Sequence, residues 1–391
     1  MTAVNITGLG VVSALGVGAA HHFNQLKSGV VGIARYPRDE DFLYAGKVNF
    51  TNRQLAALCG VQFSNYTSRT ALLGLFAAKE ALSRIKSVRK FPAAFVNGAT
   101  VGGMDLSEQY FAGKSNPAQR DARVFEMHDL GANTTFIANH LRDFQYVNTI
   151  STACSSAANS IMQGAQLIRS GEFQYVLVGG TDALCDFTIE GFKSLMVYDS
   201  ALCQPFDINR RGLNLGEGAA YLLLESDECI KESGNPCLAK VVGWANRNDA
   251  FHNTGTSPEG IGAQKAMLAA LEIANLQPAE ISYINAHGTG TLNNDLSELA
   301  AMEAVFEGQL PDFSSTKGAI GHTLAASGAI EAVLSITSLL GNCAFGNIGL
   351  TDPMTPSQVL LRKPKTKEIH HVMSNSFGFG GNSTSLIFSK G

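Results

Sequence analysis

Charge is scarce in this sequence. Asp, Glu, Lys and Arg make up 16% of the 391 residues, while hydrophobic residues make up 45%; about 25% charge is usual. A long, weakly charged chain is not disordered, and its composition predicts large buried layers and a sizeable subunit interface. With 33 acidic and 29 basic side chains the net charge is −4 at pH 7. No strongly basic face is available, so we expect no nucleic-acid partner.

Paired cysteines and long apolar runs are lacking as well. None of the seven cysteines stands in a Cys-x-x-Cys pair, and a chain of this length needs no disulfide framework, so a reducing compartment fits best. The least charged stretches are 1–26, 144–168 and 332–351, and each is interrupted by polar residues or glycine. Such groups are costly in lipid. We therefore expect a cytoplasmic protein without a membrane segment.

Short runs rich in Val, Ile, Leu and Tyr alternate with helical patterns along the whole chain. The runs predict strands at 4–7, 93–96, 146–150, 175–178, 221–225, 239–242, 281–285, 372–374 and 385–388. Helical patterns fall between them at 70–84, 156–169, 261–275, 295–307 and 325–340. Strands that alternate with helices predict an α/β fold.

The two halves of the chain repeat one scheme. A strand, a polar loop and a helix that is small or apolar around most of its circumference occur at 146–169 and again at 311–340. A helix of that kind is buried. The repeat predicts a duplicated α/β fold whose N-terminal half is 1–233 and whose C-terminal half is 234–391, with the boundary in the polar segment 227–237.

Cys154 is the first candidate for chemistry. It lies in STACSSAAN, residues 151–159, where a strand ends and a helix of small residues begins. The start of a helix presents unpaired N–H groups and a partial positive charge, which stabilise a thiolate. The structural alternative is a buried core cysteine.

Three further segments carry polar groups at strand or loop ends. His287 follows a strand in INAHGTGT, 284–291, and could donate a hydrogen bond or move a proton. Lys317 and His322 precede the second buried helix, in which Glu331 could pair with Lys317. The turn NSFGFGGNS, 375–383, lets a backbone N–H approach a ligand closely. The structural alternatives are a hydrogen-bonded structural histidine for His287, an exposed charge for Lys317 and a flexible hairpin for the glycine-rich turn. Taken together with the segment of Cys154, however, these segments match acyl-thioester chemistry.

The motifs also resemble those of a known family. TACSS, QPFD followed by RGLNLGEGAA, NAHGTGT-x-x-x-D, K-x-x-x-GH-x-x-AASG and NSFGFGGN occur in order. They resemble the β-ketoacyl-acyl carrier protein synthases of the thiolase superfamily, over most of 149–225 and 281–334, the N-terminal ITGLGVVSALG and the last strand. The Cys-His-His set is that of the elongating synthases, because thiolases carry a second cysteine and initiating synthases an asparagine. The resemblance implies a five-layered αβαβα fold with two central buried helices.

The resemblance implies a decarboxylative Claisen condensation in fatty acid, polyketide or aryl-polyene chain elongation. Cys154 would take an acyl group from a carrier protein. His287 and His322 would stabilise the enolate formed when malonyl-carrier protein loses carbon dioxide. Lys317, paired with Glu331, would set the position of His322. ISTACSSAAN and GLNLGEGAAYLLLE resemble the aryl-polyene branch most.

The remaining roles are also implied by the resemblance. Backbone N–H groups of Cys154 and Phe379 would hold the oxyanion. The gate for the acyl chain would comprise the glycine-rich turn and the loop 249–256, with Asp249, Phe377, Gly378, Gly380 and Gly381 beside Phe379. The pantetheine arm would lie near Thr289 and Thr291.

No metal or bound cofactor is implied, since the acyl carrier protein brings its own phosphopantetheine. The expected partners are that carrier protein and a second subunit, in a homodimer or in a heterodimer with a chain-length-factor-like chain.

The sequence departs from the family pattern at three places. Leu292 replaces a frequent proline, Asn382-Ser383 replaces Thr-Asn, and residues 105–145 match poorly. Because that last region helps to shape the acyl pocket in the family, the acyl chain that this protein accepts stays open.

Three other functions are compatible with single features. A chain-length-factor-like subunit shares the fold, but such subunits usually lack the nucleophilic cysteine. GLGVVS, 8–13, suggests a dinucleotide-binding oxidoreductase, although its sixth position is serine rather than glycine or alanine. His287 and His322 could ligate zinc, but no cysteine stands at ligand spacing near them in the sequence.

Overall fold

The computed structural model describes residues 2–391 except 39–40, 84, 87–89, 113–120 and 356–357. Its principal strands are β1 (Asn5–Ser13), β2 (Gly16–Val17), β5 (Ala93–Gly98), β6 (Tyr146–Ile150), β7 (Tyr175–Asp182), β8 (Gly218–Glu225), β9 (Ala239–Asn248), β10 (Tyr283–Asn285), β11 (Asp312–Ser314), β14 (His371–Gly378) and β15 (Asn382–Lys390). Two small ribbons pair β3 (Ala34–Arg38) with β4 (Asp41–Ala45) and β12 (Cys343–Ala344) with β13 (Lys365–Thr366).

The helices are α1 (Ala19–Lys27), α2 (Asn52–Leu58), α3 (Arg69–Leu82), α4 (Met104–Phe111), α5 (Leu130–Asn139), α6 (Ser156–Ser170), α7 (Asp186–Ser194), α8 (Asp227–Ser233), α9 (Ile261–Ala274), α10 (Leu292–Val305), α11 (Lys317–Ile320) and α12 (Ser327–Gly341). Short 3-10 turns lie at Ala122–Met127, Pro278–Glu280 and Leu324–Ala326. The predicted helix 70–84 ends at Leu82 in the structure, and position 84 lies outside the described residues.

The described strands of the main sheet repeat one topology. Their order is β11-β10-β14-β15-β9-β1-β8-β7-β5-β6. In the first half β8 pairs antiparallel with β1 and β7, and β5 and β6 continue parallel to β7. The second half repeats this scheme with β9, β15, β14, β10 and β11 in the corresponding places. The predicted duplicated α/β fold is confirmed.

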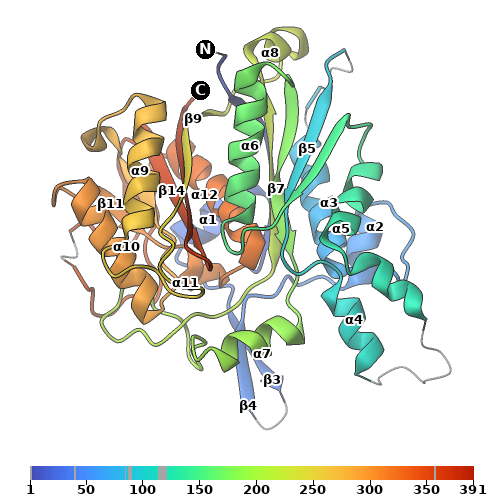
Figure 1. The fold of residues 1–391 in the computed structure, drawn as a ribbon, viewed down its shortest axis with the longest axis horizontal. Coiled ribbons are helices and arrows are strands. Elements are labelled where there is room, and N and C mark those ends of the chain that lie inside the picture. Colours follow the sequence, from blue (N-terminus) through green and yellow to red (C-terminus); the bar gives the residue numbers. More distant parts are fainter. Residues whose placement is uncertain (1, 39–40, 84, 87–89, 113–120, 356–357) are drawn as a thin grey trace.

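The layers follow from which faces the helices cover. Helices α6 and α12 pack against each other and against strands of both halves, so they form the middle layer (Figure 1). Helices α3 and α5 cover the outer face of the first half, and α9 and α10 that of the second (Figure 1). This is the predicted αβαβα arrangement. The two sheet layers are nevertheless joined, because β1 and β9 pair at Asn5–Lys240 and Ile6–Ala239.

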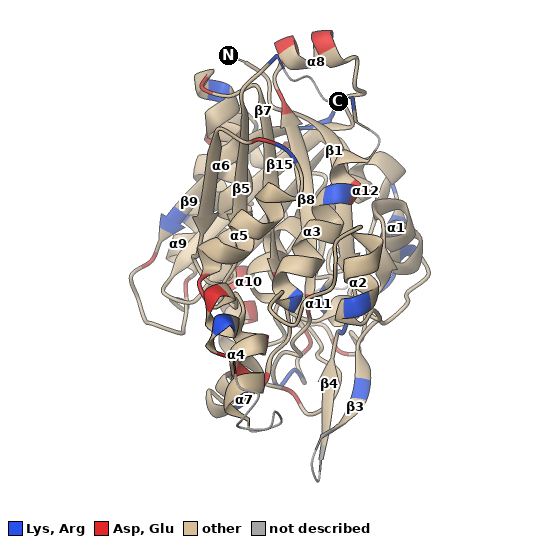
Figure 2. Ribbon diagram, turned by 90° about the vertical axis from the view of Figure 1, so that its right-hand side faces the viewer, with Lys and Arg blue, Asp and Glu red and all other residues tan. Residues whose placement is uncertain are grey.

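The middle layer explains the low charge. All residues of α12 from Ser327 to Leu339 are buried. The segment Leu324–Gly341 is long and apolar enough to cross a membrane, but 89% of it is buried inside the protein, which is the place of a core helix. In the view of Figure 2 the charged residues lie mostly on outer helices and loops, and the central strands carry few.

The first strand is longer than predicted and removes one alternative function. GLGVVS lies within β1, whereas a dinucleotide fingerprint needs a turn from a strand into a helix. Its glycines serve packing: a Cβ on Gly8 would lie 2.2 Å from the carbonyl oxygen of Ala81, and one on Gly10 2.0 Å from that of Ala77. Glycine here lets α3 lie directly on the strand, so the oxidoreductase interpretation is wrong.

Candidate active site

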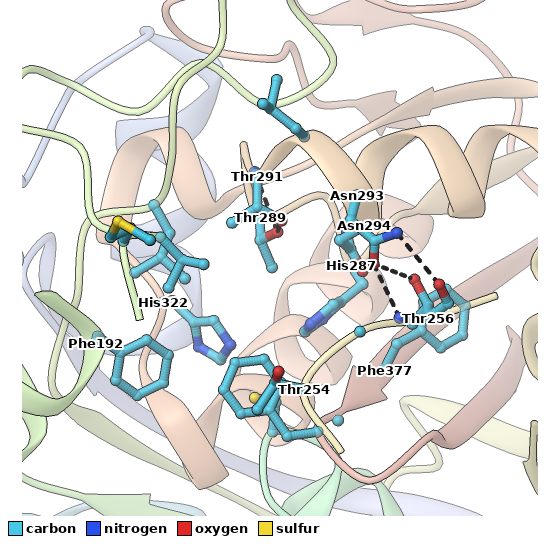
Figure 3. A pocket seen from close by; sticks show the side chains of 18 of the residues that line it. Phe192, Thr254, Thr256, His287, Thr289, Thr291, Asn293, Asn294, His322 and Phe377 are labelled. Atoms are coloured by element: carbon cyan, nitrogen blue, oxygen red, sulfur yellow. Dashed lines mark hydrogen bonds between the residues drawn. The ribbon is translucent and has the colours of Figure 1, made fainter. Parts of the chain in front are cut away.

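Both halves of the fold deliver side chains to one cavity of about 250 Å³. Cys154 comes from the start of α6, His287 from the loop after β10, and His322 from the loop before α12. Phe377 and Gly378 come from the end of β14, and Phe379 from the turn between β14 and β15. Figure 3 shows His287 and His322 flanking the cavity, with Thr289 and Thr291 along the same wall.

A tight turn presents the nucleophile. Ala153 has φ of +52°, a left-handed conformation that is uncommon outside glycine and typical of strained functional turns. Cys154 follows, and α6 begins two residues later at Ser156. The thiol is only 7% exposed.

Burial raises the pKa of Cys154 to about 11, although the charge of Lys317 and the N–H groups of Phe379 and Cys154 act in the opposite direction. Desolvation outweighs these three opposing effects, so the resting sulfur carries its proton at pH 7, whereas the sequence favoured a thiolate.

His322 is fixed in one tautomer by its surroundings. Its Nδ1 accepts a hydrogen bond from the N–H of Leu324 at 3.1 Å and lies 3.0 Å from Oγ of Ser327. Burial, together with the charge of Lys317, lowers the pKa of His322 well below 6.5, so the ring is neutral at pH 7. A neutral ring whose Nδ1 accepts carries its proton on Nε2.

His287 is held in the same tautomer by Lys317. The ammonium group can only donate, and Nζ lies 3.2 Å from Nδ1 of His287 and 2.6 Å from its carbonyl oxygen. Burial lowers the pKa of His287 well below 6.5, and the charges of Lys317 and His322 act in the same direction. His287 is therefore neutral with its proton on Nε2.

Lys317 contacts a different histidine from the one expected. It hydrogen-bonds to Glu331, as the sequence suggested, and both side chains are 1% exposed. Its other bonds go to His287 rather than His322, because α11 places the ammonium under the loop that follows β10. It acts on His322 only through its charge.

The two imidazoles and the thiol form one cluster. The ring centroids of His287 and His322 are 5.4 Å apart with an interplanar angle of 89°. One nitrogen of each ring and Sγ of Cys154 lie within 4.8 Å of one another. Sequence spacing gave no sign of this metal-capable trio. The buried ammonium of Lys317 beside His287 opposes a bound cation, however, and the same arrangement suits an anionic enolate.

The glycine-rich turn lies against the nucleophile turn. The backbone N–H of Phe379 favours the thiolate form of Cys154 and so acts to lower its pKa. A Cβ on Gly378 would lie 2.8 Å from the carbonyl oxygen of Thr152, so only glycine allows this approach. The ring of Phe379 stacks on Phe192 with centroids 5.7 Å apart and planes at 21°.

Asp249 lies beside this turn rather than in the cavity wall. Gly381 has φ of +78°, and a Cβ there would lie 2.3 Å from Oδ1 of Asp249. The N–H of exposed Gly380 donates to the carbonyl oxygen of Asn253 at 2.7 Å. The predicted gate segments, 249–256 and 375–383, are thus in direct contact.

The loop that carries Thr289 and Thr291 is braced by buried acidic residues of α10. Glu298 accepts the N–H groups of His287 and Gly288 at 2.9 and 2.8 Å, and Asp295 accepts that of Thr289 at 3.0 Å. Burial raises the pKa of Glu298 to about 7 against the opposing N–H bonds.

Arg210, in the stretch between QPFD and GLNLGEGAA, braces the same loop. It donates to the carbonyl oxygens of Thr291 and Leu292. The motif that the sequence offered without a role is therefore a support for the cavity wall.

Sequence reasoning missed several wall residues. Phe192 and Met196 line the cavity from α7 and the turn after it, which carry no motif, and Arg211 and Leu213 line it from the RGLNLGEGAA motif. A second cavity, of about 330 Å³, also reaches Cys154, Phe192 and Phe379, and it is lined in addition by Thr100, Val101, Ser151, Ala153, Thr188 and Leu324. The hydrophobic rings of Phe192 and Phe379 thus lie between two spaces that meet at the thiol.

Fold and site together define a condensing enzyme of the thiolase type, with a cysteine and two histidines at the junction of two similar halves. Residues 1–229 match the family model for the N-terminal domain of β-ketoacyl synthase, and residues 238–350 match that for its C-terminal domain. The chain belongs to the β-ketoacyl synthase family.

Individual relatives of this chain carry names that fit this family. The chain is 35% identical to 3-oxoacyl-[acyl-carrier-protein] synthase 2 of Staphylococcus aureus (strain COL) over 249 residues, which cover 61% of this chain but only 60% of that relative. It is 35% identical to the enzyme of that name from Rhizobium meliloti (strain 1021) over 309 residues, 75% of this chain and 73% of the relative. A solved structure described as a ketosynthase in complex with its chain length factor, from Xenorhabdus doucetiae, is 31% identical with a TM-score of 0.86 over 100% of this chain and 98% of the other.

Proposed function

We propose that this protein is a β-ketoacyl-acyl carrier protein synthase, an acyltransferase that lengthens an acyl chain with malonyl-carrier protein. The observation that carries the proposal is the trio of Cys154, His287 and His322, with both rings neutral and both Nε2 atoms protonated. A nucleophile beside two hydrogen-bond donors is what a thioester condensation needs. Phosphopantetheine arrives on the carrier protein, so the reaction requires no resident cofactor.

The first stage is acyl transfer. The sulfur of Cys154 attacks the acyl thioester, the new C–S bond forms, and the carrier's thiolate leaves and takes up the proton that the cysteine loses. The N–H groups of Cys154 and Phe379 are the donors for the oxyanion, since both favour negative charge at the sulfur. The pantetheine arm lies along Thr289 and Thr291, which line the entrance cavity.

The second stage is decarboxylation and condensation. Malonyl-carrier protein loses carbon dioxide, and the electron pair moves into an enolate whose oxygen is held by the Nε2–H groups of His287 and His322. The enolate carbon attacks the acyl-cysteine, so that a C–C bond forms and the C–S bond breaks. The released sulfur of Cys154 takes up a proton from solvent. Neutral rings suit this role because they donate a hydrogen bond without losing their proton.

Two subunits form the working protein in this proposal. The outer strand β6 is only partly buried, with Val147 42% exposed, whereas the equivalent strand β11 is fully buried. An edge strand left open in this way invites pairing with another chain. The partner is either a second copy or a chain-length-factor-like subunit, and light scattering of the purified chain, alone and with candidate partners, tells them apart.

We place the enzyme in the cytoplasm. All seven cysteines are free thiols and six of them are buried, as expected for a protein that matures in a reducing compartment. The aryl-polyene branch remains our proposal for the pathway, on the likeness of the stretches ISTACSSAAN and GLNLGEGAAYLLLE.

Intact-mass spectrometry tests the function directly. The purified chain is mixed with acyl-carrier protein, and then with malonyl-carrier protein, with Cys154→Ala as the matched control. We expect an acyl adduct on the enzyme and a carrier-bound product longer by one acetyl unit, both absent in the variant. An active Cys154→Ala protein would reject the mechanism. A chain that takes no acyl group even with its partner present would be a chain-length-factor-like subunit instead.

A further inference from the structure

An uncharged cluster of side chains lies behind the nucleophile turn. Its members hydrogen-bond to one another and come from four separate segments: Thr152, Ser155, Asn159, Asn246, Asn382 and Thr384. We call it the amide cluster. Motif reasoning gave it no role, because its members are scattered over the chain.

Asn382 is the centre of the amide cluster. Its side-chain oxygen accepts hydrogen bonds from Ser155 Oγ at 2.7 Å, from Asn159 Nδ2 at 3.0 Å and from Asn246 Nδ2 at 2.6 Å. A carbonyl oxygen has two lone pairs, so three donors saturate it. One atom thus ties the nucleophile turn, helix α6 and strand β9 to the start of β15.

The position of Asn382 in the chain makes these bonds consequential. It is the first residue of β15, directly after the turn that carries Phe379, and it is paired with Gly378 across the hairpin. Ser155 directly follows Cys154. The two backbone N–H donors proposed for the oxyanion therefore belong to segments that meet in a single hydrogen bond, Ser155 to Asn382.

The turn is held on its outer side by hydrogen bonds between Gly380 and residues Asn248 and Asn253, whereas Asn382 ties it to the nucleophile turn. Gly380 is exposed and has φ of +83°, and Gly381 has φ of +78°. Glycine is the least restrained residue in such conformations. Donors must stand about 2.7–3.1 Å from the oxyanion to be effective, and a displacement of 1 Å can cost about a hundredfold in rate.

We propose that Asn382 is a positioning residue that locks the glycine-rich turn onto the nucleophile turn and so fixes the distance between the N–H groups of Cys154 and Phe379. The inference rests on the proposed function. It predicts that acyl transfer and condensation depend on Asn382, whereas decarboxylation, which uses the two histidines, does not.

A matched pair of variants tests this inference. Asn382→Val and Asn382→Thr have the same shape, but only threonine keeps a hydroxyl that can accept from Ser155. For Asn382→Val we expect the single-turnover rate of acyl transfer to Cys154 to fall about 10- to 100-fold. For Asn382→Thr the rate should lie between that of the valine variant and the wild type. Release of carbon dioxide from malonyl-carrier protein, without an acyl primer, should stay within about twofold for both.

Alkylation of Cys154 by iodoacetamide gives a readout that does not depend on turnover. The N–H of Phe379 favours the thiolate, so loosening the turn should move the alkylation profile of Asn382→Val to higher pH, with a smaller move for Asn382→Thr. A wild-type protein that is inactive in both half-reactions would count against the proposed function. The alkylation profiles would still test whether Asn382 positions the glycine-rich turn. Two results would overturn the positioning role of Asn382. One is an equal loss of acyl transfer and decarboxylation, and the other is unchanged acyl transfer together with unchanged alkylation.

Discussion

Replacing Glu331 by glutamine separates what the buried ion pair does for stability from what it does for chemistry. Glu331 and Lys317 are each 1% exposed and hydrogen-bond directly to one another. In Glu331→Gln the ammonium keeps its place but loses its compensating charge. Lys317 must then remain charged without a partner, give up its proton or draw water into the core, and each course costs free energy.

The magnitude follows from the burial. Removing one partner of a buried pair typically costs about 3–5 kcal/mol, a large part of the roughly 5–15 kcal/mol by which proteins are stable. The same substitution at Glu232 is a matched control, because its pair with Lys90 is exposed, at 50% and 65%, with 3.4 Å between the charged atoms. Exposed pairs are worth about 0–1 kcal/mol.

The double variant Lys317→Met/Glu331→Leu completes the test. Replacing both charges by apolar side chains of similar size removes the unpaired buried charge, so we expect the double variant to be more stable than Glu331→Gln. It should fall short of the wild type by about 1–3 kcal/mol for each acceptor of His287 that is left unpaired. Decarboxylation should not return. Methionine cannot donate to Nδ1 of His287, and a hydrogen bond from a charged group is worth about 1.5–3 kcal/mol, or roughly 10- to 100-fold in rate.

Urea unfolding measures the free energy of unfolding, and carbon dioxide release from malonyl-carrier protein measures the rate of decarboxylation, on the same samples. A double variant that recovers both would show that Lys317 does not hold the tautomer of His287. A Glu331→Gln protein as stable as Glu232→Gln would show that the pair is not desolvated.

Other predictions concern the site and its pH dependence. His322→Ala should lower carbon dioxide release by about 10²–10³, the usual effect of losing one such donor; normal release would contradict the role of its Nε2–H. Because burial raises the pKa of Cys154 to about 11, its alkylation rate should still be climbing at pH 10, and a plateau near pH 8 would refute the protonated resting thiol. Glu298 has its pKa raised to about 7, so its contribution to stability is complete below pH ~4.5 and declines as the pH rises to 7. The free energy of unfolding of the wild type relative to Glu298→Gln should fall over that interval in urea titrations, and a rise would reverse our assignment.

Much of the site was readable from the sequence because its reacting side chains sit at strand ends next to small residues. Cys154 and His322 each precede a buried helix, His287 follows the end of a strand, and the repeat of the strand, loop and buried helix predicted the duplicated fold. The pairing of Lys317 with Glu331 was also predictable, since a charge inside an apolar helix needs a partner.

What the sequence did not predict depends on distance and burial. Lys317 contacts His287 rather than His322 because α11 lies next to the loop after β10. This tertiary contact leaves no pattern in the local sequence. Phe192 and Met196 line the cavity from a segment of no recognisable pattern. The state of the thiol was misjudged for a similar reason: the start of a helix is visible in the sequence, but the desolvation that outweighs it is not.

The repeated topology divides the reaction centre between two copies of one arrangement of strands and helices. The loop before α6 supplies the sulfur, and the equivalent loop before α12 supplies an imidazole. Neither copy holds a complete set of reacting groups. The copies are joined through the middle helices, through the pairing of β1 with β9 and through side-chain hydrogen bonds such as those of Arg210 to Thr291 and Leu292, so the separation of sulfur and imidazole is set by the packing of one copy on the other. The relative positions of the reacting groups therefore depend on the contact between the two halves.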